Sequence, residues 1–164
     1  MHRATRGVSR GTTSTWRSKM RQLEQQMTVH GNSPYTLTYP EAAGQTFEKG
    51  APVVLNASGQ VQEAATPAAS ICGVAAMPAT GVANNNVTVW VADDDTIFAA
   101  NMNGGVQADI GKLVTVSKTG ALWSFDRTIA GTFLITNIDV QQPSGQVIGR
   151  GHWLQSASQL WKAA

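Results

Sequence analysis

The feature that most constrains this chain is a succession of short strand-like runs, separated by turn residues, along most of its 164 residues. One run, Val87 to Val91, alternates three valines with Thr88 and Trp90, so an extended strand would carry the valines on one face. Clusters such as Asn84-Asn85-Asn86 and Pro143-Ser144-Gly145 are typical of turns. The runs that we expect to form strands span residues 35–39, 52–55, 71–77, 87–91, 96–100, 113–117, 122–125, 132–138 and 146–154.

The composition agrees with this pattern. Only 13% of the residues are charged and 16 are glycine, which disfavours a helical bundle and favours short strands joined by tight turns. No apolar run approaches the roughly 20 residues that a membrane span needs. The sequence therefore predicts an all-β protein, a single β-barrel or jelly-roll-like sandwich of about nine or ten short strands.

The charge is divided unevenly along the chain. Residues 1–26 hold six basic residues and one acidic residue, a net charge of +5, whereas residues 27–164 have a net charge of −3. The first segment has few apolar side chains to offset its ordering entropy, which predicts an extended N-terminal arm. We expect a basic arm over residues 1–34, extended or partly helical, a β domain over 35–154 and a C-terminal tail over 155–164.

Several interpretations of the arm stay open. It could be a tether that gains order on a neighbouring subunit, or its arginines could neutralise nucleic-acid phosphates. Translation could instead begin at Met20 or Met27. The stretch 14–27 could also form a short helix, because its apolar side chains recur at helical spacing at Trp16, Met20, Leu23 and Met27.

Groups that could support catalysis are few. Cys72 is the single cysteine and lies in an apolar run, which predicts a buried thiol, and of the three histidines only His152 lies well inside the β domain. No nucleophile elbow, zinc-protease motif or phosphate-binding loop occurs. We therefore expect no enzyme activity, no cofactor and no metal. Asp93-Asp94-Asp95 could hold a hard cation, but a solvated loop or a salt-bridged interface is the preferred interpretation.

The tryptophans have two expected roles. Trp90 and Trp123 are expected to pack inside the β domain. Trp153 and Trp161 lie near the C-terminus, beside a polar stretch, and could anchor a subunit interface. The alternative is a tail that folds back over its own domain.

Six short segments of the sequence resemble segments of tailed-bacteriophage head decoration (capsid cement) proteins. The likeness covers about residues 44–140 and includes Gly59-Gln60-Val61-Gln62-Glu63-Ala64 and Ile71-Cys72-Gly73-Val74-Ala75. The remaining segments are residues 44–53, 95–100, 108–112 and 133–139. The resemblance implies a β-barrel or jelly-roll-like virion protein that is made in the host cytoplasm and sits on the outer capsid surface.

The expected function follows from that resemblance. The protein would bind the phage major capsid protein, bridge neighbouring capsid subunits and form a homo-oligomer, with a trimer expected first and a dimer second. The alternatives are a nucleic-acid-binding or a carbohydrate-binding virion β-module. The residues expected at a capsid or subunit interface are Arg3, Arg6, Arg10, Trp16, Arg17, Arg21, Trp153 and Trp161.

Overall fold

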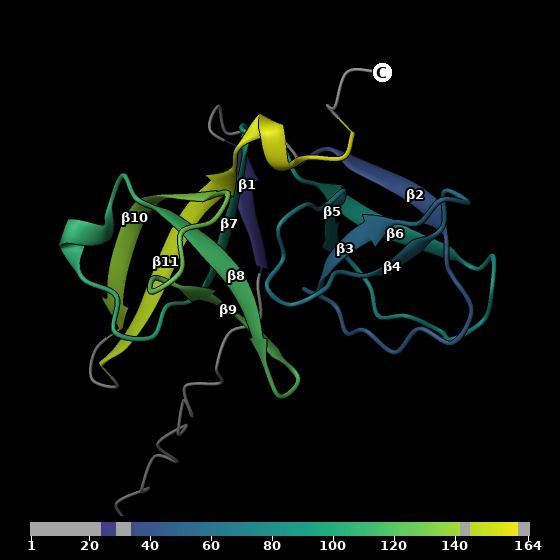
Figure 1. The fold of residues 1–164 in the computed structure, drawn as a ribbon, viewed down its shortest axis with the longest axis horizontal. Helices are drawn as coiled ribbons and strands as arrows, with labels where there is room; N and C mark the ends of the chain where they lie inside the picture. The colour runs from purple at the N-terminus through teal and green to yellow at the C-terminus, as the bar shows by residue number, and fades with distance from the viewer. Residues whose placement is uncertain (1–23, 29–33, 142–144, 161–164) are drawn as a thin grey trace, which may run out of the picture.

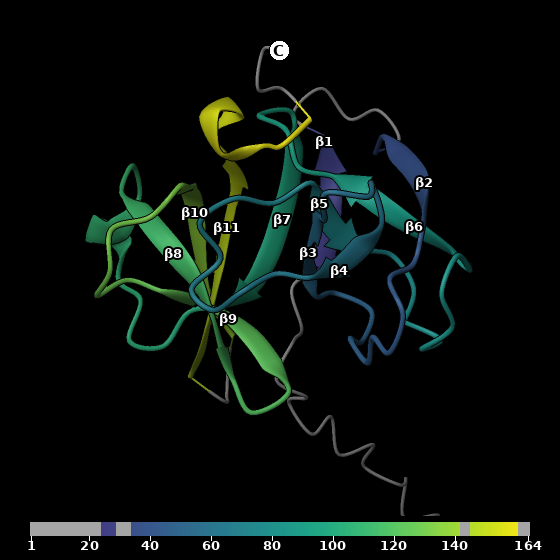
Figure 2. The same ribbon diagram turned by 45° about the vertical axis from the view of Figure 1, so that its right-hand side comes forward.

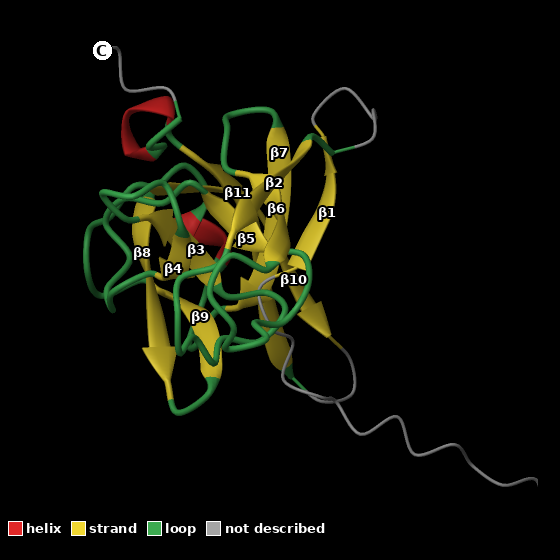
Figure 3. Cartoon of the chain, turned by 90° about the vertical axis from the view of Figure 1, so that its right-hand side faces the viewer, coloured by secondary structure: helices red, strands yellow, loops and turns green. Residues whose placement is uncertain are grey.

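A computed structural model describes residues 24–28, 34–141 and 145–160. Their eleven strands form two antiparallel sheets, ordered β1-β7-β11-β10-β8-β9 and β2-β6-β5-β3-β4 (Figure 1). The only helical elements among these residues are two 3-10 turns, which appear red in Figure 3. The strands are β1 (Glu24–Thr28), β2 (Thr36–Pro40), β3 (Pro52–Leu55), β4 (Val61–Glu63), β5 (Gly73–Ala75), β6 (Asn86–Val91), β7 (Thr96–Asn101), β8 (Leu113–Thr119), β9 (Leu122–Asp126), β10 (Phe133–Gln141) and β11 (Gln146–Trp153), and the turns are η1 (Gln107–Asp109) and η2 (Gln155–Ala157).

The predicted all-β class is confirmed, and the strands are divided between two modules. The first module contains β2 to β6, and a parallel bridge between Glu41 and Val61 brings the end of β2 against β4, so its sheet closes on itself. The second module contains β7 to β11, and a parallel bridge between Met102 and Phe125 closes it in the same way. Figures 1 and 2 show the two modules side by side.

The two modules have the same topology. In each, the first strand pairs with the fifth, the fifth with the fourth, the fourth with the second and the second with the third. Their backbone hydrogen bonds also correspond: Gly50 donates to the carbonyl of Ala75, and Gly111 donates to that of Ile135. The two donors are 61 residues apart. The chain is therefore a structural repeat of a five-stranded unit.

Glycines in the left-handed region mark the same points of both repeats. Gly50 and Gly111 precede the second strand, with φ of 91° and 85°. Gly59 and Gly120 form the following hairpin turn, with φ of 72° and 62°. A side chain disfavours this conformation, so glycine is the favoured residue at these turns.

A single hydrophobic core joins the modules. Buried side chains from both belong to one cluster, which includes Phe47 of the first module and Trp123 of the second. Between β4 and β5 the chain crosses to the second module, where the Ala68 amide donates to the carbonyl of Val116. The segment after β11 returns to the first module, because the Ile71 amide donates to the carbonyl of Ala157.

Most predicted strands lie close to the observed ones, and Val87, Val89 and Val91 are buried on one face of β6 as expected. Residues 24–28, which we assigned to the arm and to the end of a short helix, form instead strand β1, paired antiparallel with β7. Backbone pairing at the edge of a sheet does not require the apolar alternation that this segment lacks. The rest of the predicted arm lies outside the described residues.

Candidate functional site

Most of the predicted interface residues cannot be placed. Arg3, Arg6, Arg10, Trp16, Arg17, Arg21 and Trp161 lie outside the described residues. Trp153 is the one predicted site residue that the structure describes.

Trp153 is part of the core. Its side chain is fully buried, and its ring makes edge-to-face contacts with Phe98 and Phe133 at centroid distances of 5.0 and 4.7 Å. No surface of this ring is left for a partner or for stacking on a sugar, so the predicted interface role of Trp153 is wrong. The described part of the tail packs over its own domain, which was the alternative interpretation.

The cysteine and the histidine do not form a reactive pair. Cys72 is buried in the first module, where burial raises the pKa of its thiol to about 12. His152 lies on β11 in the second module, and its Nδ1 is 3.3 Å from the carbonyl oxygen of Trp153. A thiol protonated at neutral pH and closed to solvent is a poor nucleophile.

In the acidic cluster Asp93-Asp94-Asp95, the side chain of Asp93 stabilises a turn. An Asp93 carboxylate oxygen accepts hydrogen bonds from the amides of Asp95 and Thr96, at 3.2 and 2.6 Å, and so organises the start of β7. Within the described ranges, no three His, Cys, Asp or Glu side chains are grouped so as to hold a metal ion.

Glu41 is a fully buried carboxylate that fixes a loop. It accepts hydrogen bonds from the amide and hydroxyl of Thr80 and from the amide of Gly81, at distances of 2.6–3.1 Å. Burial by itself raises the pKa of Glu41, but these hydrogen bonds outweigh it and hold the pKa below its ordinary value. The loop between β5 and β6 is thereby tied to the end of β2.

Asp109 plays a similar part in the second module. It is buried at the end of η1 and contacts the Lys112 ammonium at 2.9 Å, the Arg127 guanidinium at 2.9 Å and the Val106 amide at 3.0 Å. The hydrogen bonds from Lys112 and Val106, with the positive charge of Arg127, outweigh burial and lower the pKa of Asp109. This network holds the connection between β7 and β8 in place.

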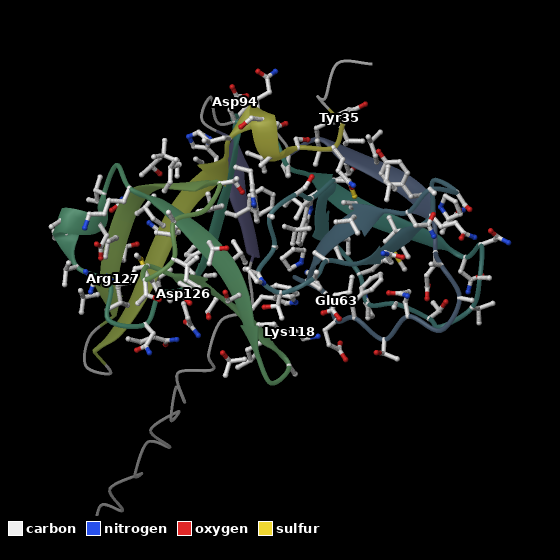
Figure 4. The ribbon with its side chains drawn as sticks, viewed as in Figure 1. Tyr35, Glu63, Asp94, Lys118, Asp126 and Arg127 are labelled. Carbon is white, nitrogen blue, oxygen red and sulfur yellow. The ribbon has the colours of Figure 1, made fainter. Side chains whose placement is uncertain are left out.

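A cavity of about 300 Å³ opens at the seam between the modules. Glu63 of the first module accepts hydrogen bonds there from Lys118 at 2.6 Å and from the Trp123 indole at 3.0 Å. Figure 4 shows Glu63 and Lys118 close together at the seam. One oxygen of Glu63 thus accepts from two donors of the second module, so the cluster braces the two modules across the seam.

The second module has an exposed apolar surface along the η1 connection. The connection follows the edge of β10, since the Gln107 side chain donates to the carbonyl of Ile138 and the Gly111 amide donates to that of Ile135. Exposed apolar patches often mark protein–protein interaction sites. The members of this η1 surface are Val106 and Ile110 on the connection, Leu113 at the start of β8 and Val140 near the end of β10, each between 41% and 51% exposed.

Sequence reasoning missed the η1 surface. Residues 106–110 lie between the expected strands 96–100 and 113–117, and the pattern of their side chains gives no sign of which ones face solvent. The signal that could have found them is the presence of Val106 and Ile110 in a turn segment, where polar residues are usual.

Comparisons with known proteins add no relative. No family model matches the sequence, and a search of curated proteins finds no significant match. No helix of the described residues is long and apolar enough to cross a membrane.

Proposed function

We propose that this protein is a structural, non-enzymatic virion protein that binds the outside of a phage capsid and bridges neighbouring major capsid subunits. The resemblance of segments within residues 44–140 to decoration proteins supports the phage major capsid protein as the partner. The observation that carries the binding function is the η1 surface, whose four exposed apolar side chains lie on and beside a connection that Asp109 holds in place.

The mechanism needs no chemistry. Joints between capsid subunits are the places where internal pressure would first separate the shell. A rigid protein that spans a joint adds buried apolar area there and makes separation more costly. The single core of the two modules supplies this rigidity, because relative motion of the modules would open buried surface.

The experiment adds the purified protein to expanded heads that lack it and measures their disruption temperature. Binding with a higher disruption temperature is expected. Absence of both binding and a temperature shift would contradict the proposal.

Matched variants test the surface itself. Ile110→Asp places a charge on the η1 surface, where binding to heads should weaken at least tenfold because a carboxylate must be desolvated. Val82→Asp places the same charge on an exposed valine of the first module, and it should bind as the wild type does. Equal binding by both variants would assign the contact to another surface.

The uneven charge of the chain supports nucleic-acid binding as the second candidate. Residues 1–26 carry a net charge of +5, so binding to DNA would fall steeply with salt and be lost when these residues are deleted. The carbohydrate-binding alternative loses one of its two expected stacking residues, since Trp153 is buried.

A further inference from the structure

The outer edge of β2 is open in the described part of the chain. Tyr35 accepts a hydrogen bond from the Val91 amide, and the Glu41 amide donates to Asn85, so odd-numbered residues of this strand bond to β6. The backbone groups of Thr36 and Thr38 between them therefore point away from the sheet. Both threonines are exposed, and β2 ends its sheet at the rim of the first module (Figure 1).

The equivalent edge of the second repeat is covered. β7 corresponds to β2, and its Ile97 and Ala99 stand opposite Met27 and Glu24 of β1. With the shift of 61 residues between the repeats, Ile97 and Ala99 are the counterparts of Thr36 and Thr38. The same two backbone positions thus pair with a sixth strand in one repeat and with no described strand in the other.

The sequence of this open edge is a palindrome. Residues 34–40 read Pro-Tyr-Thr-Leu-Thr-Tyr-Pro, centred on Leu37. Two copies placed antiparallel about a two-fold axis at Leu37 would pair Tyr35 with Tyr39, Thr36 with Thr38 and Leu37 with itself. Aromatic pairs and Thr–Thr pairs across antiparallel strands are stabilising, and no charged residue opposes the contact.

We propose that a second copy of this chain occupies the edge, and that the protein is a two-fold dimer joined by antiparallel pairing of β2 with β2. Thr36 and Thr38 of opposite copies then exchange amide-to-carbonyl hydrogen bonds, four in all. Tyr35, which is 60% exposed, gains an aromatic neighbour. Pro40 has no amide hydrogen to donate, so the paired segment ends there.

This inference goes beyond the proposed function and does not depend on it. It makes the dimer, which the sequence placed second to a trimer, the assembly of choice. β1 of another copy is a less suitable occupant, because in the described structure β1 is already paired with β7.

A cysteine cross-link tests the register. Leu37 would face Leu37 of the second copy as a non-hydrogen-bonded pair, with Cα atoms about 4.5 Å apart, a distance that a disulfide spans. Leu37→Cys should therefore give a covalent dimer on mild oxidation of the full chain. Thr36→Cys is the control: its two copies would lie about 8–9 Å apart, too far for a disulfide. The native Cys72 is buried in both variants.

Sedimentation tests the assembly without a new cysteine. The wild type should dimerise with concentration, and Thr38→Pro should weaken the dimer roughly tenfold or more, because it removes one outward amide donor from each copy. A wild type that stays monomeric or forms a trimer would overturn the proposal, as would cross-linking at Thr36→Cys in place of Leu37→Cys. Should Thr38→Pro fail to fold, the mass of the wild type and the Leu37→Cys cross-link still decide whether the protein is a dimer paired through β2.

Discussion

Glu41 shows how one buried carboxylate can hold a turn of the repeat. Its oxygens accept four hydrogen bonds from Thr80 and Gly81, and Glu41→Ala would leave the donors of that loop without partners. We expect a loss of about 2–4 kcal/mol in the free energy of unfolding, measured by urea denaturation. Glu48→Ala, at an exposed position, is the control and should change stability little.

The same residue makes stability depend on pH. Because the folded protein holds the pKa of Glu41 below the ordinary value of 4.5, the unfolded chain takes up the proton first as pH falls. This contribution is complete above about pH 4.5 and is lost as pH drops through the lowered pKa. Glu41→Gln should reduce the slope of stability against pH in that range; an unchanged slope would show that other carboxylates dominate.

Cys72 gives a test of how closed the first module is. Its thiol is fully buried and has a pKa of about 12, so it is protonated and shielded near neutral pH. A thiol reagent at pH 8 should therefore react only as fast as the native protein opens, and at once in denaturant. Rapid reaction of the native protein would show that solvent reaches the site.

At the scale of elements, the repeat predicts that substitutions at equivalent positions of the two modules lower the free energy of unfolding by similar amounts. Gly59 and Gly120 occupy the same hairpin turn of the two modules in the left-handed region, and a Cβ at either would meet no atom within 4 Å. Gly59→Ala and Gly120→Ala should each cost about 1–2 kcal/mol, from backbone strain alone. Gly151→Ala should cost more, because its Cβ would lie 1.8 Å from the carbonyl oxygen of Leu134. Denaturation of the three variants measures this order.

The strands that alternation predicts well are those with one buried and one solvated face, such as β6. β1 could not be found this way, because Glu24-Gln25-Gln26-Met27-Thr28 is held by the edge of β7 and not by an apolar pattern of its own. The core position of Trp153 was hidden for another reason. The inward face of β11 carries Gly149 and Gly151 before Trp153, and glycine shows no hydrophobic alternation although neighbouring side chains fill its place.

The repeat itself was not predicted from the sequence, because equivalent positions of the two modules share their place in the fold more often than their residue type. Pro52-Val53-Val54-Leu55 and Leu113-Val114-Thr115-Val116 share an inward valine, Val53 or Val114, but few identities. What they have in common is the register: Pro52 pairs with Val74, and Leu113 pairs with Leu134. The open edge of β2 is visible only once β7 is recognised as its counterpart.

At the scale of the whole molecule, the shared core predicts that the two modules unfold together. Trp90 lies in the first module and Trp123 in the second, so each can report on its own module. Two variants would keep either Trp90 or Trp123, with Phe at the other tryptophan positions that tolerate it. The urea unfolding transitions of the two variants should coincide. Separate midpoints for the two reporters would show that the modules are independent domains.

The positions of the two proposed surfaces also bear on bridging. In Figure 1, η1 lies at one end of the long axis, on the second module, and β2 lies toward the other end, on the first. A dimer joined at β2 would therefore carry its two η1 surfaces far apart, as a clamp between separate capsid subunits requires. Where both sites engage at once, binding through two linked sites can be about 10²–10⁴-fold tighter than through one.

This arrangement predicts that loss of the dimer weakens capsid binding although the η1 surface is intact. Thr38→Pro should bind expanded heads at least tenfold more weakly than the wild type, and disulfide-linked Leu37→Cys should bind at least as tightly as the wild type. Head binding is measured by co-sedimentation at fixed ionic strength. If Thr38→Pro is monomeric and binds as the wild type does, the dimer does not serve bridging. If Ile110→Asp also binds normally, the η1 surface is not the contact, and the two proposals fail separately.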